Sequence, residues 1–426
     1  MLVETISGVR GIYGEEITRE LILGYAAALD ALLGKGPIVI GMDSRHSGPE
    51  IHKLFSQHMD REIISVGVAP TPVVSHAVVQ EKSAGGIMIT ASHNPIDFNG
   101  WKLLGPDGAI IAEKDAAKMK AWARTLKPRT NTFPVTCKDA ISSYLKSVSA
   151  LIEEVKPLAG KILADPNGGA AVQLIKDSGM PFKMHHSTQG GFWRDIEPNP
   201  LSLSPLEKEL KKLGCDVAAA FDCDADRVEF LTKEGICLTG NDALGILAHT
   251  MLEEGDTLVV NDATSHMVHE VCASIGAKIV EVEVGERNVV EGIARHHAVI
   301  GGEGSSGGVI FPPGKTRDGF RSLLGLMQAM QQRSLKEWLR TLPRKHYRKA
   351  LFAVPHPSRA VKVLRKHYAD HPQRSQQTSL KILFDDGFLW LRPSQTEWGM
   401  LVIVAEASAD DLVQKRIREA YDLSQH

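Results

Sequence analysis

Three pairs of short apolar segments constrain the fold of this chain more than any other feature. The first member of each pair ends at an aspartate, and the second ends in a loop rich in Gly, Ser or Asp. The aspartates are Asp43, Asp165 and Asp262, and the loops are 90–95, 222–227 and 303–308. Loops at the carboxyl ends of strands form the usual binding edge of α/β sheets. The pattern predicts three similar α/β units that each contribute one loop to a shared site.

Helical and strand-like patterns also alternate along most of the chain. Residues 17–34 have apolar positions at helical spacing, with Thr18 as the expected N-terminal cap. Residues 37–43 follow as a short buried strand. A basic stretch at 344–349 is interpreted as a solvated linker or helix end. Two strands and a final helix after it predict a smaller α+β unit.

Composition excludes several classes of protein. The chain has 426 residues and a net charge of -2, so it is long enough for several domains and has no basic field for nucleic acid or anionic lipid. No apolar run is long enough to span a bilayer, and the N-terminus lacks the apolar segment of a signal peptide. The five cysteines form no CxxC pair. We therefore expect reduced thiols in a cytoplasmic protein with no membrane or nucleic-acid partner.

The stretch FDCDADR contains three alternating aspartates, Asp222, Asp224 and Asp226. Alternate side chains of an extended segment point the same way, and three carboxylates on one side repel unless a cation lies between them. Hard oxygen ligands of this kind suit Mg²⁺. An EF-hand is excluded because Arg227 replaces the required glycine and Lys233 replaces the glutamate at the twelfth position. Arg227 is placed to hold a carboxylate or a phosphate. A solvated acidic loop is the alternative, and the apolar strand VAAAF before the loop disfavours it.

The stretch GGEGSSGG at 301–308 allows a ligand to approach the backbone closely. Glu303 can accept hydrogen bonds from sugar-like hydroxyls, and a plain flexible loop is the alternative. The embedded GxSxG pattern is not a hydrolase elbow, because two prolines prevent the helix that must follow. Residues 314–316 read GKT but do not end a P-loop, because Val309 stands at the required first glycine.

The stretch LRPSQTE presents Arg392, Ser394 and Thr396 on one side of an extended segment. A guanidinium and two hydroxyls suit a phosphate dianion. An ordinary hairpin turn is the alternative interpretation.

The stretch MITASHNP ends an apolar strand at Ser92. Asn94 and Pro95 are expected to form a turn that keeps the serine hydroxyl exposed. Serine is a weak nucleophile unless a base or metal activates it, and His93 is a possible base for a hydrolytic triad. The aspartate loop and the phosphate clamp favour phosphoryl transfer through Ser92 instead. Lys102 is then a phosphate ligand or a proton shuttle.

Together these stretches resemble the α-D-phosphohexomutase family, which includes phosphoglucomutases, phosphomannomutases and phosphoglucosamine mutases. The resemblance covers nearly the whole chain, and TASHNP with the downstream NGWK is its most specific part. The other matching stretches are SGVRG, MDSRHSG, EPNP (197–200), FDCDADR, VGERN (284–288), GGEGSSGG and RPSQTE.

The resemblance implies an α/β fold with three similar α/β domains of mixed sheets and a smaller C-terminal α+β domain around a central cleft. The expected domains span 1–132, 133–238, 239–342 and 343–426. It implies no fixed oligomeric state, and we expect a monomer or a homodimer.

The implied reaction is reversible phosphoryl transfer between O1 and O6 of a hexose phosphate. A phosphoserine carries the phosphoryl group, and a hexose 1,6-bisphosphate is both the intermediate and the activator. The implied catalytic residues are Ser92, Arg10 and Lys102. The implied Mg²⁺ ligands are Asp222, Asp224 and Asp226 together with Ser92. The implied substrate-binding residues are Arg227, Arg287, Glu303, Ser305, Arg392, Ser394 and Thr396.

Some positions depart from the family pattern. The sugar loop has no histidine, and Gln395, Trp398 and Leu401 differ from the residues usual near the phosphate clamp. Mannose, glucose and N-substituted or free glucosamine phosphates all stay open as substrates. Two alternatives also stay open: a paralogue that binds sugar phosphate without turnover, and a Mg²⁺ phosphatase with an aspartyl nucleophile.

Overall fold

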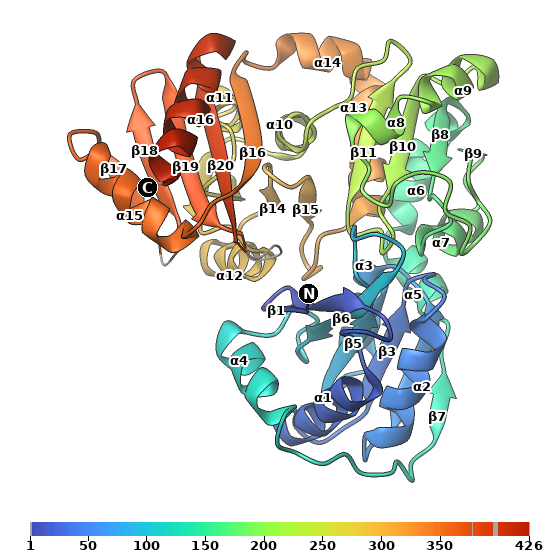
Figure 1. The fold of residues 1–426 in the computed structure, drawn as a ribbon. Helices are drawn as coiled ribbons and strands as arrows, with labels where there is room; N and C mark the ends of the chain where they lie inside the picture. Colours follow the sequence, from blue (N-terminus) through green and yellow to red (C-terminus); the bar gives the residue numbers. More distant parts are fainter. Residues whose placement is uncertain (1, 377, 395–398, 426) are drawn as a thin grey trace. The chain divides into compact units, whose positions relative to one another are not determined.

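The computed structural model describes residues 2–376, 378–394 and 399–425. It divides into two compact units, coloured along the chain in Figure 1. The first unit comprises Met1–Thr239 and Gly307–Glu337, and the second comprises Gly240–Ser306 and Trp338–His426. The four expected domain boundaries stay predictions.

The first unit begins with a seven-stranded mixed sheet in the order β1-β2-β6-β5-β3-β4-β7. Its strands are β1 (Val3–Thr5), β2 (Gly8–Ile12), β3 (Ile38–Met42), β4 (Ile63–Val68), β5 (Gly85–Ile89), β6 (Phe98–Leu104) and β7 (Val135–Cys137). Its helices are α1 (Arg19–Leu32), α2 (Gly48–His58), α3 (Thr71–Gln80) and α4 (Glu113–Trp122). The predicted helix at 17–34 is confirmed, with Thr18 accepting a hydrogen bond from the backbone N–H of Leu21.

Helices cover both faces of this sheet. Side chains of α1, α2 and α4 form one core with alternate strand residues, among them the fully buried Trp101. Trp101 lies edge-on to Tyr25 and Phe55, with ring centroids 5.1 and 5.3 Å away. Successive side chains of a strand point to opposite faces. Lys102 therefore lies on the face opposite to Trp101.

The first unit also contains a four-stranded sheet in the order β11-β10-β8-β9. Its strands are β8 (Ile162–Asp165), β9 (Lys183–Met184), β10 (Val217–Phe221) and β11 (Val228–Thr232). The neighbouring helices are α5 (Ala140–Ser147), α6 (Ser149–Val155), η1 (Lys156–Lys161), α7 (Ala171–Asp177), α8 (Pro200–Leu203) and α9 (Leu206–Leu213). Further along the chain come β15 (Gly308–Ile310), α13 (Gly319–Gln332) and α14 (Leu335–Thr341).

The second unit contains the parallel strands β13-β12-β14 and a five-stranded antiparallel sheet, β16-β20-β19-β18-β17. The parallel strands are β12 (Thr257–Asn261), β13 (Lys278–Val282) and β14 (Ile300–Glu303), with helices α10 (Gly240–Met251), α11 (His266–Ser274) and α12 (Glu286–His296). The antiparallel strands are β16 (His346–Ala353), β17 (Gln373–Ser375), β18 (Leu380–Phe384), β19 (Gly387–Pro393) and β20 (Met400–Ala407), with α15 (Pro357–His367) and α16 (Asp410–Ser424). The smaller α+β unit is thus confirmed. The interpretation of 344–349 as a linker or helix end is wrong from His346 onward, because those residues pair with β20.

The three predicted α/β units share one arrangement. In each, the strand that ends at the aspartate pairs in parallel with the strand that precedes the loop: β3 with β5, β8 with β10, and β12 with β14. Each aspartate strand also has a second parallel neighbour, β4, β9 or β13. The aspartate and the loop of each pair therefore lie at the same edge of their sheet.

The thiols and the helices bear on two expectations from the sequence. All five cysteines are free thiols. Among the described residues, no helix is both long enough and apolar enough to cross a membrane.

Candidate functional site

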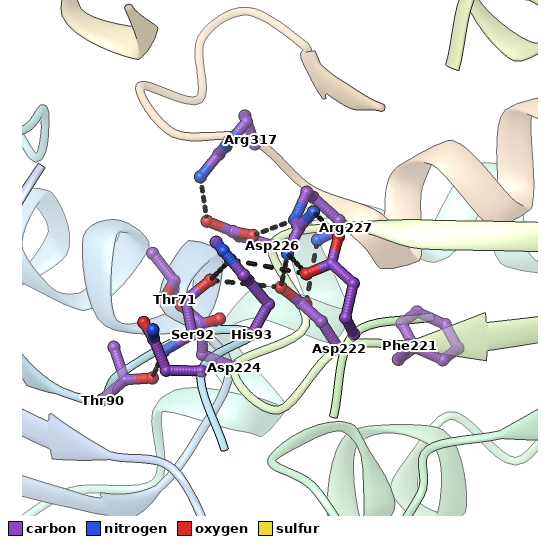
Figure 2. A network of polar contacts seen from close by, with 12 residues as sticks. Thr71, Thr90, Ser92, His93, Phe221, Asp222, Asp224, Asp226, Arg227 and Arg317 are labelled. Atoms are coloured by element: carbon purple, nitrogen blue, oxygen red, sulfur yellow. Dashed lines mark hydrogen bonds and ion pairs between the residues drawn. The ribbon is translucent and has the colours of Figure 1, made fainter. Parts of the chain in front are cut away.

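Ser92 lies just beyond the end of β5 in a strained turn. Its φ is +51°, a left-handed conformation that non-glycine residues rarely adopt. The backbone N–H of Asn94 closes the turn on the carbonyl of Ala91 at 3.1 Å. Ser92 is only 1% exposed, so the expectation of an exposed hydroxyl is wrong. The Ser92 hydroxyl donates instead to a carboxylate oxygen of Asp222 at 3.4 Å (Figure 2), in the loop after β10.

The three predicted aspartates come together. Asp222, Asp224 and Asp226 are buried, and one carboxylate oxygen of each lies within 4.8 Å of the others. Alternation along an extended segment was expected to bring them together. That expectation is wrong, because the segment is a series of turns and bends and not an extended strand. Ala225 has a φ of +52°, and this left-handed residue reverses the chain between two of the aspartates.

The donor set fits a metal ion. Oδ1 of Asp224 and Oδ1 of Asp226 are buried and accept no hydrogen bond from the described residues, although Arg227 Nε lies 3.6 Å from Oδ1 of Asp226. Buried acceptors without a donor are rare and costly, and a cation satisfies them. Burial and the neighbouring Asp226 raise the pKa of Asp222, because carboxylates placed this close together disfavour a further negative charge. A divalent cation removes that penalty.

Cationic and hydroxyl side chains hold the other carboxylate oxygens. Lys102 Nζ donates to Oδ2 of Asp224 at 2.5 Å and to Oδ2 of Asp226 at 2.6 Å. Thr71 donates to Asp224 at 2.5 Å, and Arg317 donates to Asp226 at 2.6 Å. Burial alone would raise the pKa of Asp226, but Arg317 and Lys102 outweigh it and keep this pKa well below its usual range.

Arg227 holds carboxylates, which is one of the two roles expected from the sequence. Its guanidinium donates to Asp222 at 3.1 and 3.2 Å and to both carboxylate oxygens of Glu197 at 3.0 and 3.2 Å. Glu197 belongs to the EPNP stretch, so Arg227 links that stretch to the aspartate loop. Arg10, on β2, donates to the side-chain oxygen of Asn94 at 3.2 Å and thus lies against the Ser92 turn. Burial lowers the pKa of the Arg10 guanidinium.

The arrangement of His93 excludes a hydrolytic triad. Nδ1 of His93 lies 3.4 Å from the Ser92 hydroxyl and 3.6 Å from Glu197. A triad histidine uses one ring nitrogen for the serine and the other for the carboxylate, whereas both contacts here fall on the same nitrogen. Burial, with Arg227 nearby, lowers the pKa of His93 to about 3 and leaves the ring neutral.

The second unit brings together the residues expected to bind the sugar. Glu303 accepts hydrogen bonds from Asn261 Nδ2 at 3.3 Å and from the backbone N–H of Gly285 at 3.0 Å. The same Asn261 donates to the Ser305 hydroxyl at 3.0 Å. Between them, a Cβ added at Gly304 would lie 2.1 Å from Oδ1 of Asn241, so a larger residue here would displace the Asn241 side chain.

The predicted phosphate clamp is described only in part. Arg392 is buried at the end of β19 and donates to the carbonyl of Val284 at 3.2 Å, beside the VGERN stretch. The backbone N–H of Ser394 donates to Met400 at 2.8 Å. Thr396, with Gln395 and Trp398, lies outside the described residues.

Two further positions complete the sequence expectations. Arg287, in the first turn of α12, donates to Glu291 at 2.8 Å. Leu401, which departs from the family pattern, is buried in the core of the C-terminal sheet.

Sequence reasoning missed four side chains that the structure places at these sites. Thr71 and Arg317 hold the aspartates, Asn261 holds Glu303, and Arg45 holds the Ser92 turn. The stretch MDSRHSG was a signal for Arg45, and TLVVND was one for Asn261. Thr71 and Arg317 stand far from Asp224 and Asp226 in the sequence, in stretches with no distinctive pattern.

The sequence matches two models of known protein families. Residues 3–129 match domain I of phosphoglucomutase/phosphomannomutase, an α/β/α domain, and residues 239–346 match domain III. A phosphoglucomutase/phosphomannomutase of Thermococcus kodakarensis is 30% identical over 95% of this chain and 94% of that protein. A probable phosphoglucosamine mutase of Methanothermobacter thermautotrophicus is 30% identical over 92% of this chain and 91% of that protein.

Solved structures show the same fold. A phosphoglucomutase/phosphomannomutase family protein of Burkholderia thailandensis superposes with a TM-score of 0.84 at 21% identity, covering 99% of this chain and 97% of that one. An N-acetylphosphoglucosamine mutase of Aspergillus fumigatus, in complex with GlcNAc-6P and magnesium, superposes with a TM-score of 0.64 at 14% identity. The match covers 99% of this chain and 95% of that one. Motifs, fold and full-length relatives agree: this chain belongs to the α-D-phosphohexomutase family and is an isomerase of the phosphohexomutase class.

Proposed function

We propose that this phosphohexomutase moves a phosphoryl group between O1 and O6 of a hexose phosphate through phosphorylated Ser92. The observation that carries the proposal is the contact between the Ser92 hydroxyl and Asp222, within a buried cluster of three aspartates that has unsatisfied oxygens. A serine beside a metal site and several fixed cations fits phosphoryl transfer, in which positioning and charge stabilisation supply most of the catalysis.

The proposed metal is Mg²⁺, held by Asp222, Asp224 and Asp226 with an oxygen of the phosphoserine. Carboxylate oxygens are the ligands that Mg²⁺ prefers, and the bound ion would neutralise charge on the transferring group.

In the forward direction the bond between the Ser92 oxygen and phosphorus breaks, and a new bond forms between phosphorus and the free substrate hydroxyl. The substrate hydroxyl gives up its proton as that bond forms, and the released Ser92 oxygen takes up a proton, so the step balances. We assign Lys102 and Arg10 to this proton movement or to the charge on the transferring group, because both are buried beside the Ser92 turn or the aspartates. The resulting hexose 1,6-bisphosphate then returns its other phosphoryl group to Ser92, which regenerates the enzyme. The same compound would activate enzyme that has lost its phosphate.

The second unit supplies the proposed sugar and phosphate contacts. Glu303 and Ser305 would accept or donate hydrogen bonds to sugar hydroxyls, and their shared partner Asn261 fixes both side chains. Arg392, Ser394 and Thr396 would hold the phosphate that is not being transferred. Arg287 and Arg227 are proposed as further contacts to the substrate.

The sugar itself is proposed only as a hexose phosphate, with glucose, mannose and glucosamine as the candidates. The two 30% identical relatives carry different names, one a phosphoglucomutase/phosphomannomutase and one a probable phosphoglucosamine mutase. A panel of the three 1-phosphates with Mg²⁺ and catalytic bisphosphate, scored by the 6-phosphate formed, distinguishes them.

Replacing the carrier serine tests the mechanism. Ser92→Ala should abolish turnover and protein-bound phosphate, because it removes the hydroxyl that is proposed to carry the phosphoryl group. Ser83→Ala is the matched control, since Ser83 is a buried serine whose hydroxyl donates to the backbone carbonyls of Val78 on α3 and Gly85 at the start of β5. Substantial mutase activity in Ser92→Ala would refute the phosphoserine mechanism, whereas loss in both variants would indicate damage to the fold.

A further inference from the structure

The side chain of Arg45 forms hydrogen bonds with the turn that carries Ser92. Arg45 follows β3 and is only 1% exposed. Its Nε donates to Asp43 Oδ2 at 3.2 Å. Its two Nη atoms donate to four backbone carbonyls of one loop: Ser92 at 2.8 Å, Asn94 at 2.6 Å, Pro95 at 2.5 Å and Phe98 at 2.8 Å.

These contacts use every donor that the side chain has. A guanidinium carries five N–H groups in a rigid planar fork, and Arg45 makes five hydrogen bonds. A lysine has only three donors on a single atom, so it would leave carbonyls of the loop without a partner. The path of the backbone from Ser92 to Phe98 is therefore matched specifically to an arginine.

A second chain of hydrogen bonds fixes the other side of Ser92. Asp43 accepts from the Thr90 hydroxyl at 2.6 Å, and the same hydroxyl accepts from the backbone N–H of Ser92 at 2.7 Å. With Arg45 on its carbonyl, both backbone polar groups of Ser92 are held. A non-glycine residue stays in a left-handed conformation only where its surroundings determine it strongly, and here they do.

We infer that Arg45 is a positioning residue for phosphoryl transfer, which holds Ser92 in the left-handed conformation that directs its hydroxyl at Asp222. The inference rests on the proposed role of Ser92 as the phosphoryl carrier. Arg45 acts through the loop, so its loss should misplace the phosphoserine and slow the chemical step while substrate binding in the second unit is retained. It should therefore lower kcat with little change in KM.

The test compares Arg45→Lys with Arg61→Lys. Arg61 is a matched control in the same unit, because it also joins an aspartate, Asp30, to backbone carbonyls, those of Asp30 and Gly34. Misplacement of a reacting group by about 1 Å costs on the order of 100-fold, so we expect kcat of Arg45→Lys to fall about 10- to 100-fold with KM within about threefold of wild type. Arg61→Lys should keep kcat within about twofold, as expected for a side chain away from the chemistry.

A spectroscopic measurement separates positioning from a loss of stability. The ³¹P resonance of phospho-Ser92 should shift or broaden in Arg45→Lys and match wild type in Arg61→Lys, with both variants folded by circular dichroism. A folded Arg45→Lys with wild-type kcat, or with only KM changed, would overturn the inference. An unchanged ³¹P resonance would overturn it as well.

A second variant keeps the test decisive if Arg45→Lys does not fold. Thr90→Val keeps the side-chain shape and removes the hydroxyl that joins Asp43 to Ser92, so kcat should fall about 3- to 10-fold, as for loss of buried hydrogen bonds. A folded Thr90→Val with wild-type kcat would then overturn the inference. Ser92→Ala in the same assay separates the two proposals. An active Ser92→Ala would contradict the phosphoserine mechanism. An inactive Ser92→Ala beside a fully active Arg45→Lys would contradict only the role of Arg45.

Discussion

The Ser92 site of the first unit and the sugar-loop site of the second unit sit on equivalent sheet edges but are held by different chemistry. In the first unit the strand-end aspartate, Asp43, pairs with Arg45 at 3.2 Å. In the second unit its counterpart Asp262 accepts from the Ser379 hydroxyl at 3.0 Å and from the backbone N–H of Val284 at 3.2 Å. One architecture thus holds the equivalent aspartate by an ion pair in the first unit and by a hydroxyl and a backbone N–H in the second.

The difference matches what each site is proposed to bind. The first unit concentrates three carboxylates, a lysine and two arginines around one serine, which suits a metal ion and a transferring phosphoryl group. In the second unit Glu303 is fixed by an amide side chain and a backbone N–H, which suits recognition of neutral hydroxyls. Charge changes in the first unit should therefore abolish the chemistry, whereas changes in the second should weaken binding.

The largest effect is expected from Asp224→Asn. It removes one metal ligand and leaves Lys102 with one carboxylate partner fewer, so Mg²⁺ binding should weaken and turnover should fall on the order of 1000-fold. Calorimetric titration with Mg²⁺ and initial rates measure the two effects. The control is Asp216→Asn, which changes a partly exposed aspartate that pairs with Lys233 just before β10. Its Mg²⁺ affinity and turnover should stay within about twofold of wild type. Normal Mg²⁺ affinity in Asp224→Asn would break the assignment of the metal site.

Glu303→Gln should give the next largest effect, and it should act on KM. The amide keeps the shape but weakens hydrogen bonds from sugar hydroxyls, so KM should rise about 10- to 100-fold, with a smaller change in kcat. Glu270→Gln, which changes a half-exposed partner of Lys345 in the same unit, is the control. A fall in kcat at constant KM in Glu303→Gln would show that both units take part in the chemistry and would remove the contrast between them.

The smallest effect on turnover is expected from Glu281→Gln, which tests an ionic cluster in the second unit outside both sites. Burial would raise the pKa of Glu281, but His269 and Lys381 outweigh it and lower this pKa to about 2. A depressed folded pKa gives stability that is present above the ordinary pKa of about 4.5 and is lost as the pH falls toward 2. At neutral pH, the free energy of unfolding of the wild type should exceed that of Glu281→Gln by up to about 3 kcal/mol.

Denaturant unfolding of wild type and Glu281→Gln across this pH range measures the difference in stability. The difference should shrink as the pH approaches 2, with turnover at neutral pH unchanged. A difference that is constant with pH would show that Glu281 acts through packing and not through its charge.

The sequence predicted the repeated α/β architecture and the central residues of the first site. Local patterns sufficed there, because each strand and the loop after it can be recognised from adjacent residues, and the paired strands end at the same edge of their sheet. Asp222, Asp224 and Asp226 were found for a partly wrong reason: the left-handed Ala225, and not strand alternation, brings them together. Backbone dihedrals of this kind leave little trace in the residue types.

What the sequence did not predict depends on long-range contacts. Thr71 and Arg317 lie 153 and 91 residues from the aspartates they contact, and no local pattern specifies such a pairing. Lys102 was expected to bind phosphate or carry a proton, and the structure adds that two carboxylates already hold it. The buried position of Ser92 was missed for the same reason, since its cover comes from a distant loop.

The most direct measurement of the central claim is the phosphate content of Ser92 by peptide mass spectrometry. The protein is first incubated with hexose 1,6-bisphosphate and Mg²⁺, freed of small molecules, and then mixed with a hexose monophosphate. The account predicts one phosphate on the peptide that contains Ser92 after the first step and its loss to the substrate in the second. Turnover without phosphate on Ser92, or with phosphate that stays there when substrate is added, would contradict it.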